Sequence, residues 1–452
     1  MSADAGDASR AAHAWADLRK LRIRTSVAQR IQRYVPATDR PLCDHSVGEQ
    51  VIIGLDFGTA FTKAVVRFRR RDYLVDWSTL VSLEDPALLP TGFSEAPDGQ
   101  AVLGIVPRPG WQRRLRPKVP LLATEPEKLS TMDVESAVLF VALAVREVQR
   151  WFRTTVPLAA GTPIRWRLHM GLPSESVRGA RAELFRQVAS RAMGLAMSPE
   201  RVRRAAVAST SPYESVSVIP ELQAQLRSYL HSPQRQRDLH ALFDCGAGTL
   251  DIAFFNVHQI EQSDRISVFS SRVDELGAHF LLAAMAGKRG EGLVWRDDDA
   301  NLALTQIAQK LNADIQDIER RASECLGLQR CRFNDAYTVS HRAYQTGDVM
   351  RGIRPLPLLL CGGGSKIDRI RENISRIGDE LARHSLVRLE PIPIPDPPQD
   401  SLIGDIGDNY HRVTIAHGLC ELPRNLGTLV APSEIEAFSL DHRVLVDRDA
   451  DR

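Results

Sequence analysis

The sequence predicts an α/β protein with two lobes, each built on a mixed β-sheet. At 452 residues the chain is too long for one hydrophobic core and should divide into lobes that each bury an interior of their own. Two similar blocks of strand, glycine turn and strand lie far apart in it, VIIGLDFGTAFTKAVVRF at residues 51–68 and HALFDCGAGTLDIAFFNV at residues 240–257. Each block ends its first apolar strand with an aspartate, Asp56 or Asp244. This repetition indicates two halves of similar architecture.

The spacing of apolar residues and the positions of proline and glycine predict the remaining elements. In chain order they are a helix over residues 11–34, a strand over 163–173, a helix over 176–193, a helix starting at Pro220 and Glu221, one long helix over 301–327, a buried strand over 356–361, and helices over 366–384 and 413–419. The tract PIPIPDPP at residues 391–398 is predicted to be a stiff extended connector, because a proline-rich segment stays extended.

These elements predict four segments. Residues 1–48 form a basic helical extension, residues 49–220 the first lobe, residues 221–422 the second lobe, and residues 423–452 a tail. Within the second lobe, a shortened lid subdomain is expected at about residues 277–355.

Composition narrows the class of protein. Hydrophobic residues make up 43% and charged residues 25% of the chain, which excludes a disordered or fibrous protein. The 58 basic and 56 acidic residues give a net charge of +2, which excludes nucleic-acid binding by bulk charge. None of the six cysteines forms a C-x-x-C pair. Because the sequence shows neither a signal peptide nor an apolar run long enough to span a membrane, we expect a cytoplasmic protein without a membrane span.

The glycine turns of the two blocks suggest phosphate binding. Glycines let backbone N–H groups converge on an anion, and carboxylates beside such a turn can hold Mg²⁺ that bridges to phosphate oxygens. The candidate phosphate-binding residues are Gly58, Thr59, Ala60, Gly246, Ala247, Gly248 and Thr249, and the candidate metal-binding residues are Asp56, Asp244 and Asp251. Lys63 could neutralise charge on a transferred phosphoryl group. The alternative for either block alone is an ordinary hairpin turn.

A third glycine cluster, CGGGS at residues 361–365, follows a predicted buried strand and precedes a helix. A helix N-terminus and a close backbone approach suit a phosphate or a nucleoside. Gly363, Gly364, Ser365 and Lys366 are therefore candidate nucleoside contacts. Because all three glycine clusters occur together in this order, we favour a nucleotide site over three unrelated turns.

In these motifs the chain resembles the superfamily of actin, sugar kinases and seventy-kilodalton heat-shock chaperones. GLDFGTAFTKAVV resembles its first phosphate motif, and FDCGAGTLD its second, with Ala247 where glycine is usual. LLLCGGGSKIDRI resembles its adenosine motif, and VIPELQAQL and VTIAHGL its two connecting helices. The resemblance covers roughly residues 50–422 and is closest to the chaperone nucleotide-binding domain, with no room for a peptide-binding domain.

The resemblance implies an actin-like ATPase with duplicated ribonuclease-H-like domains and with ATP or ADP and Mg²⁺ in the cleft between the lobes. It implies that Glu221 places the attacking water, that Asp244 is catalytic, and that either Lys63 or Lys118 faces the transferred group. Glu319, Arg320 and Ser323 are candidates for contact with adenine. The implied activity is slow hydrolysis of ATP to ADP and phosphate, as a switch that acts with a partner protein. A filament-forming ATPase that assembles with itself and a small-molecule kinase stay open as alternatives.

Residues 1–48 lie outside the resemblance. Between Leu18 and Tyr34 they carry basic residues without an acidic one, together with apolar residues at helical intervals. Such a helix can pack on its own ATPase body, dock on a partner protein or lie on anionic lipid. The sequence leaves these three open.

Overall fold

The computed structural model describes residues 48–78, 85–104, 109–158, 161–174, 178–236, 239–260, 263–287, 304–344, 354–397, 401–404 and 409–435. These residues divide into two compact units. The first unit holds the described residues up to Ser228 together with Asp396–Pro423, and the second holds Tyr229–Pro395 and the described residues from Arg424 onward. The helix predicted over residues 11–34 lies outside the described residues.

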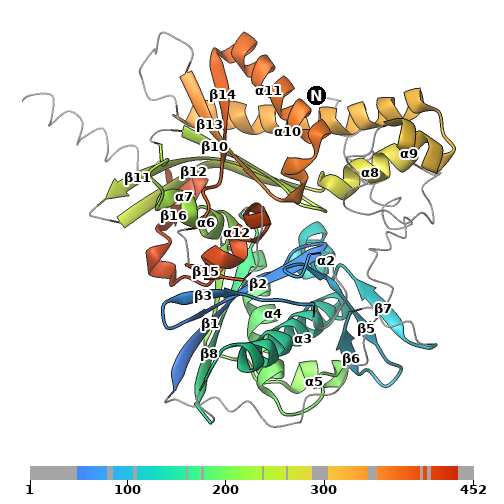
Figure 1. Cartoon of the computed structure of the whole chain (residues 1–452), viewed down its shortest axis with the longest axis vertical. Coiled ribbons are helices and arrows are strands. Elements are labelled where there is room, and N and C mark those ends of the chain that lie inside the picture. The colour runs from blue at the N-terminus through green and yellow to red at the C-terminus, as the bar shows by residue number, and fades with distance from the viewer. Residues whose placement is uncertain are drawn as a thin grey trace, which may run out of the picture. The chain divides into compact units, whose positions relative to one another are not determined.

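The first unit is built on a mixed sheet with the strand order β15-β3-β2-β1-β8-β9, to which β4 adds beside β2, and on a small antiparallel sheet with the order β6-β5-β7 (Figure 1). Its strands are β1 Glu49–Asp56, β2 Phe61–Phe68, β3 Arg71–Leu74, β4 Leu89–Pro90, β5 Gly92–Glu95, β6 Ala101–Leu103, β7 Gln112–Leu115, β8 Ile164–Leu172, β9 Val216–Pro220 and β15 Leu402–Ile403. Its helices are α2 Lys118–Ala123, α3 Thr131–Thr155, α4 Ala180–Met197, α5 Arg204–Ser209, α6 Glu221–Gln225 and α12 Tyr410–Leu419, with a 3-10 turn at Pro126–Lys128.

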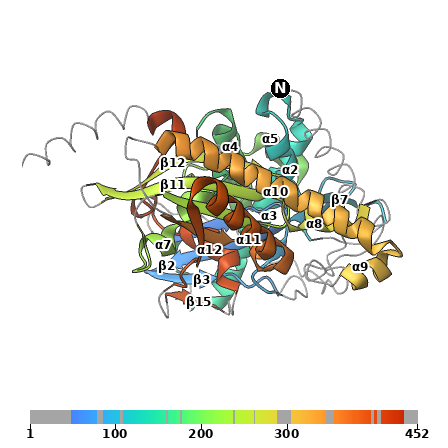
Figure 2. The same ribbon diagram turned by 90° about the horizontal axis from the view of Figure 1, so that it is seen from above.

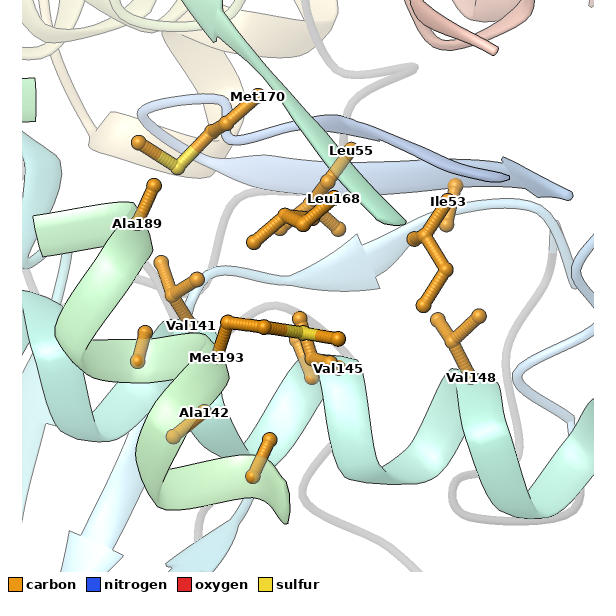
Figure 3. Packing of buried hydrophobic residues seen from close by; sticks show 14 of the residues in the cluster. Ile53, Leu55, Val141, Ala142, Val145, Val148, Leu168, Met170, Ala189 and Met193 are labelled. Carbon is orange, nitrogen blue, oxygen red and sulfur yellow. The ribbon is translucent and has the colours of Figure 1, made fainter. Parts of the chain in front are cut away.

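The core of the first unit lies between one face of the sheet and the helices α3 and α4. Alternate residues of β1 and β8, among them Ile53, Leu55 and Leu168, point to this face and meet Val145 of α3 and Met193 of α4, as Figure 3 shows. All five are fully buried. The 25-residue α3 starts at Ser130, whose hydroxyl accepts a hydrogen bond from the amide of Asp133 at 3.2 Å.

The second unit is built on a mixed sheet with the strand order β14-β13-β10-β11-β12-β16. Its strands are β10 Leu239–Cys245, β11 Leu250–Ile260, β12 Ser263–Asp274, β13 Arg354–Cys361, β14 Val387–Pro393 and β16 Thr428–Val430. Its helices are α8 Ala278–Ala286, α9 Leu304–Leu311, α10 Ile315–Tyr344 and α11 Asp368–Ser385, with a 3-10 turn at Gly363–Lys366. Helix α10, the long orange helix in Figure 2, packs on β11 and β12. Helix α7, Arg227–Leu230, spans the boundary between the units, and a 3-10 turn at Pro423–Asn425 spans their last boundary.

The two sheets share one topology. In the first, β3, β2 and β1 are antiparallel neighbours, and β8 and then β9 continue parallel to β1. In the second, β12, β11 and β10 are antiparallel neighbours, and β13 and then β14 continue parallel to β10. The parallel pairs β8–β9 and β13–β14 are each joined through a helix, α4 in the first and α11 in the second, because a parallel pair needs a crossover connection. The prediction of an α/β chain is confirmed, and each of the two units contains a mixed sheet.

The prediction of one helix over residues 301–327 is wrong. The structure has α9, which ends at Leu311, and α10, which begins at Ile315. Asn312 has φ +48° between them, a conformation that asparagine tolerates better than most residues. The side chain of Asp314 then accepts a hydrogen bond from the amide of Gln316 at 2.7 Å and starts α10. The apolar residues keep a helical spacing across this break, so their pattern alone did not show that one helix ends and another begins.

Three other predictions are corrected. The proline-rich tract 391–398 is not only a connector, because its first residues belong to β14, an edge strand parallel to β13. Pro391 and Pro393 fit there because proline has no N–H, and every second N–H of an edge strand has no partner within the sheet. The predicted tail 423–452 contains β16, which pairs with β12. The helix predicted over residues 176–193 lies at 180–197.

The division between the units also differs from the expected lobes. It falls at Tyr229 rather than at residue 221, and Asp396–Pro423 belongs to the first unit. The reason is packing: α6 and α12 lie against each other and on β1, β8 and β9 of the first sheet. In the predicted lid region, residues 288–303 and 345–353 lie outside the described residues.

Candidate functional site

The turn between β1 and β2 brings two predicted site residues of the first unit together. Asp56 and Lys63 are directly opposite each other on the antiparallel ladder, so their side chains share one face. The Lys63 ammonium lies 2.8 Å from the Asp56 carboxylate, and the lysine side chain is 18% exposed against 4% for the aspartate. A Cβ at Gly58 would lie 3.6 Å from the Lys63 Nζ, so the ammonium stands beside the glycine turn.

Backbone contacts fix this turn. A Cβ at Gly58 would lie 2.1 Å from the carbonyl oxygen of Phe61, so only glycine fits there. The Gly58 amide donates to the Asp56 carbonyl at 3.0 Å, and the Thr91 hydroxyl donates to the Gly58 carbonyl at 3.0 Å. The Thr91 amide donates to the Ala60 carbonyl at 2.8 Å. The Gly58 amide is thus used within the turn, while Thr59 is buried at its tip.

The first unit holds a second acid–lysine pair. The Lys118 ammonium, at the start of α2, donates to the Glu221 carboxylate at 2.8 Å, and both side chains are less than 10% exposed. Glu221 is the first residue of α6, which follows β9 through Pro220, a residue that suits a helix start. The hydroxyl of Ser174 accepts a hydrogen bond from the Leu222 amide at 3.0 Å. Gly171 makes space for the Glu221 side chain, since a Cβ at residue 171 would lie 3.0 Å from the Glu221 carboxylate.

The equivalent hairpin of the second unit, β10 and β11, carries two acids instead. Asp244 and Asp251 are directly opposite each other, in the same place and with the same separation along the chain as Asp56 and Lys63 in the first unit. Like charges directly opposite each other on a ladder are unfavourable, and a bound cation is one way to compensate them. Two carboxylates on one face provide the hard oxygen ligands that Mg²⁺ takes. The donor set therefore fits the predicted metal.

The turn at residues 246–249 is tied to the start of α8. The amides of Ala278 and His279 donate to the carbonyls of Gly246 and Ala247 at 2.9 and 2.8 Å. The amide of Gly246 donates to the Thr249 carbonyl at 2.9 Å, so this predicted phosphate donor serves the turn itself. Gly248 and Thr249 are half-buried.

The glycine cluster after β13 lies directly beside this turn, within the second unit. Strands β10 and β13 are parallel neighbours that pair Asp244 with Cys361. Gly362 has φ +74°, and a Cβ there would lie 2.3 Å from the Asp244 carboxylate, so the backbone passes closely over the acid. A Cβ at Gly364 would lie 2.4 Å from the Cys245 sulfur. Burial raises the pKa of the Cys245 thiol, which fills the space under Gly364 as a neutral group.

Gly362 is a residue that the sequence reasoning did not select. The signal was present in the run of three glycines, but only the parallel pairing of β10 and β13 shows which one approaches Asp244. Gly363 begins the 3-10 turn. The Ser365 hydroxyl donates to the Gly362 carbonyl at 2.7 Å and so serves the turn. Lys366 is exposed.

The predicted adenine contacts lie on one face of α10. Glu319, Arg320 and Ser323 are all exposed. The Arg320 guanidinium is held by Asp317 at 2.6 Å and by Glu324 at 2.7 Å on the same helix. These three residues therefore form a polar stripe in the second unit, one to two turns into a 30-residue helix.

One further cluster, Asp72, His417 and Cys420, has metal-ligand chemistry, with its ligand atoms within 4.8 Å of one another. Its charges do not suit a cation. Asp72 accepts two hydrogen bonds from Arg67, at 2.7 and 2.8 Å, and its carboxylate lies 3.3 Å from the Arg227 guanidinium. A divalent ion there would face two fixed positive charges. The cluster instead holds α12 to β2 and β3, because His417 of α12 lies 3.0 Å from the Asp72 carboxylate.

This buried cluster makes the stability of the first unit depend on pH. Burial lowers the pKa of His417 and of His169, whose Nδ1 lies 2.8 Å from the Leu419 carbonyl. The unfolded chain then binds these protons more readily, so their contribution is complete above the ordinary histidine pKa of 6.5 and is lost as the pH falls below it. We expect the melting temperature to fall between pH 7 and pH 5, measured by scanning calorimetry. His417→Asn should make this dependence less steep, because only His169 then contributes, whereas the exposed His384→Gln should leave it unchanged; an equally steep fall in His417→Asn would contradict the assignment.

Among the described residues no helix is long and apolar enough to cross a membrane. Neither a protein-family model nor a curated protein matches this chain.

Proposed function

We propose that this chain binds Mg–ATP and hydrolyses it slowly, as a molecular switch of the actin-like class that acts with a partner protein. Among the members of that class, the chaperone nucleotide-binding domain is the one that the motifs resemble most. The observation that carries the proposal is the duplicated sheet, in which each copy opens with a hairpin that ends its first strand in an aspartate.

The residues of the second unit would hold the nucleotide and its metal. Asp244 and Asp251 would bind Mg²⁺ and its waters, and Mg²⁺, when bound, supplies charge neutralisation to the phosphates. The Thr249 hydroxyl would donate to a phosphoryl oxygen. The backbone at Gly362 to Gly364, which passes closely over the Asp244 carboxylate at Gly362, would contact a nucleoside next to the metal.

The residues of the first unit would act on the transferred group. Lys63, which stands at its glycine turn and is the more exposed of the two lysines, would face the phosphate, while Asp56 holds its ammonium in place. Glu221 would orient the attacking water, and the buried Lys118 would hold the Glu221 carboxylate. This division would give different roles to the two lysines that the sequence left open as alternatives.

Nucleotide binding by the full chain is the first test of this proposal. We expect calorimetric titration to show binding of ADP and ATP that needs Mg²⁺, and phosphate release that needs no added sugar or other acceptor. Phosphate release that depends on an added acceptor would favour a kinase. Failure of the wild-type chain to bind any nucleotide would contradict the proposal.

Gly364→Val is expected to abolish this binding, because the added side chain would collide with Cys245 and displace the turn over Asp244. Gly327→Val is the matched control, since a Cβ at Gly327 of α10 would make only an ordinary contact of 3.7 Å with the Arg330 guanidinium. The control should bind nucleotide as the wild type does. Circular dichroism should show that both variants keep their helix content. If Gly364→Val bound nucleotide with wild-type affinity, the glycine cluster at residues 362–364 would not be part of the nucleotide site.

A further inference from the structure

The turn between β2 and β3 has a backbone conformation that its residues do not favour. The two strands pair Phe68 with Arg71, so the loop consists of Arg69 and Arg70 alone. Their φ angles are +49° and +67°. A two-residue hairpin loop with both φ angles positive is the turn that asparagine and glycine favour. Of the described non-glycine residues with positive φ, these are the only consecutive pair.

The same turn concentrates positive charge. Arg69, Arg70 and Arg71 are consecutive and all exposed. Arg69 has local partners, because it pairs with Glu49 and its guanidinium lies 4.9 Å from the centre of the Phe68 ring. Within the described part of the chain, the side chains of Arg70 and Arg71 make no hydrogen bond and no ion pair. Local interactions therefore explain Arg69 but neither of its neighbours.

A strained backbone that presents charge without a partner among the described residues is typical of a contact site. We propose that Arg69, Arg70 and Arg71, the arginine tip, dock on an acidic segment of a partner protein. Guanidinium groups bind carboxylates through two parallel hydrogen bonds, and a hairpin tip presents them on a rigid sheet. This inference does not depend on the proposed nucleotide chemistry.

Two other anionic partners fit the tip less well. Binding to an anionic membrane surface takes a larger basic cluster or an inserted apolar group, and the neighbouring Phe68 is only 4% exposed. Nucleic-acid binding takes several phosphate contacts along an extended basic surface, and the tip is one loop of a chain with net charge +2.

The test separates binding from stability. In the full chain, Arg70→Gly combined with Arg71→Gln removes two charges, relieves the strain at residue 70 and keeps the Arg69–Glu49 pair. We expect the melting temperature to rise by about 1 to 4 °C, since glycine adopts this φ freely. We expect the affinity for a fluorescent octa-glutamate peptide, measured by anisotropy at low salt, to fall by about five- to tenfold. The matched control Arg191→Gln with Arg376→Gln removes two exposed arginines elsewhere and should bind the peptide as the wild type does.

Several outcomes would overturn the proposal. Wild-type peptide affinity in the tip variant would do so, as would an equal loss in the control, which would mean that bulk charge binds the peptide. A melting temperature lowered in the variant with Arg70→Gly and Arg71→Gln would show that these arginines serve the fold. Tighter binding to phosphatidylserine vesicles or to a 20-base-pair duplex DNA than to the peptide would assign the tip to a membrane or to nucleic acid instead.

Discussion

Gly418→Ala is expected to destabilise the first unit by at least about 3 kcal/mol, an effect large enough to threaten its folding. A Cβ at Gly418 of α12 would lie 1.9 Å from the carbonyl oxygen of Ala224 in α6. On the opposite side of α12, a Cβ at Gly54 of β1 would lie 2.4 Å from the Ala416 carbonyl oxygen. The backbone of helix α12 is therefore in direct contact with the backbones of α6 and β1. Neither can move away without losing contacts with the rest of the first sheet.

Helix propensity alone predicts the opposite sign for this substitution, because alanine is favoured over glycine within a helix by about 1 kcal/mol. Gly378→Ala in α11 is the matched control. A Cβ there would make only an ordinary contact of 3.4 Å with Leu389, so propensity should decide and the variant should be slightly more stable. Urea unfolding of both variants, followed by circular dichroism, measures the difference. Equal stability of the two would show that α6 and α12 are not in close contact.

Asp244→Asn is expected to reduce ATP hydrolysis by on the order of 10²-fold or more, if the proposed function is correct. Asp244 faces Asp251 across the ladder and lies under the backbone of Gly362, so it is the acid that the hairpin and the glycine cluster share. Loss of one carboxylate leaves half of the proposed metal-binding pair. The expected signature is that Mg²⁺ with ATP raises the melting temperature of the wild type but raises that of the variant much less.

Asp335→Asn, which changes an exposed aspartate of α10 with 61% side-chain exposure, is the control for the loss of one negative charge. It should hydrolyse ATP at the wild-type rate. Hydrolysis at the wild-type rate in Asp244→Asn would show that Asp244 is not catalytic. An unchanged rise in melting temperature with Mg²⁺ and ATP would show that it does not bind the metal.

The local parts of the site could be predicted from the sequence, because they depend on neighbours in the chain. Apolar runs interrupted by glycine predicted both hairpins, and the seven-residue interval of each hairpin is what places Lys63 opposite Asp56 and Asp251 opposite Asp244. Pro220 correctly predicted the helix start at Glu221.

Contacts between distant segments could not be predicted in the same way. The pairing of Lys118 with Glu221 joins residues 103 positions apart, and a lysine followed by apolar residues does not show which acid it meets. The approach of Gly362 to Asp244 depends on the register of β13 beside β10. The sheet β6-β5-β7 was missed because its strands are short.

The order in which the chain visits the two units has a practical consequence. Within the described residues it passes from one unit to the other after Ser228, after Pro395 and after Pro423. A fragment that ends at Ser228 lacks α12, the helix that packs on both Gly54 and Ala224. To produce the first unit alone, residues 48–228 would have to be joined to residues 396–423 by an artificial linker, or supplied with that segment as a second polypeptide. The first unit is thus a discontinuous domain, formed by two segments of the chain that are separated by most of the second unit.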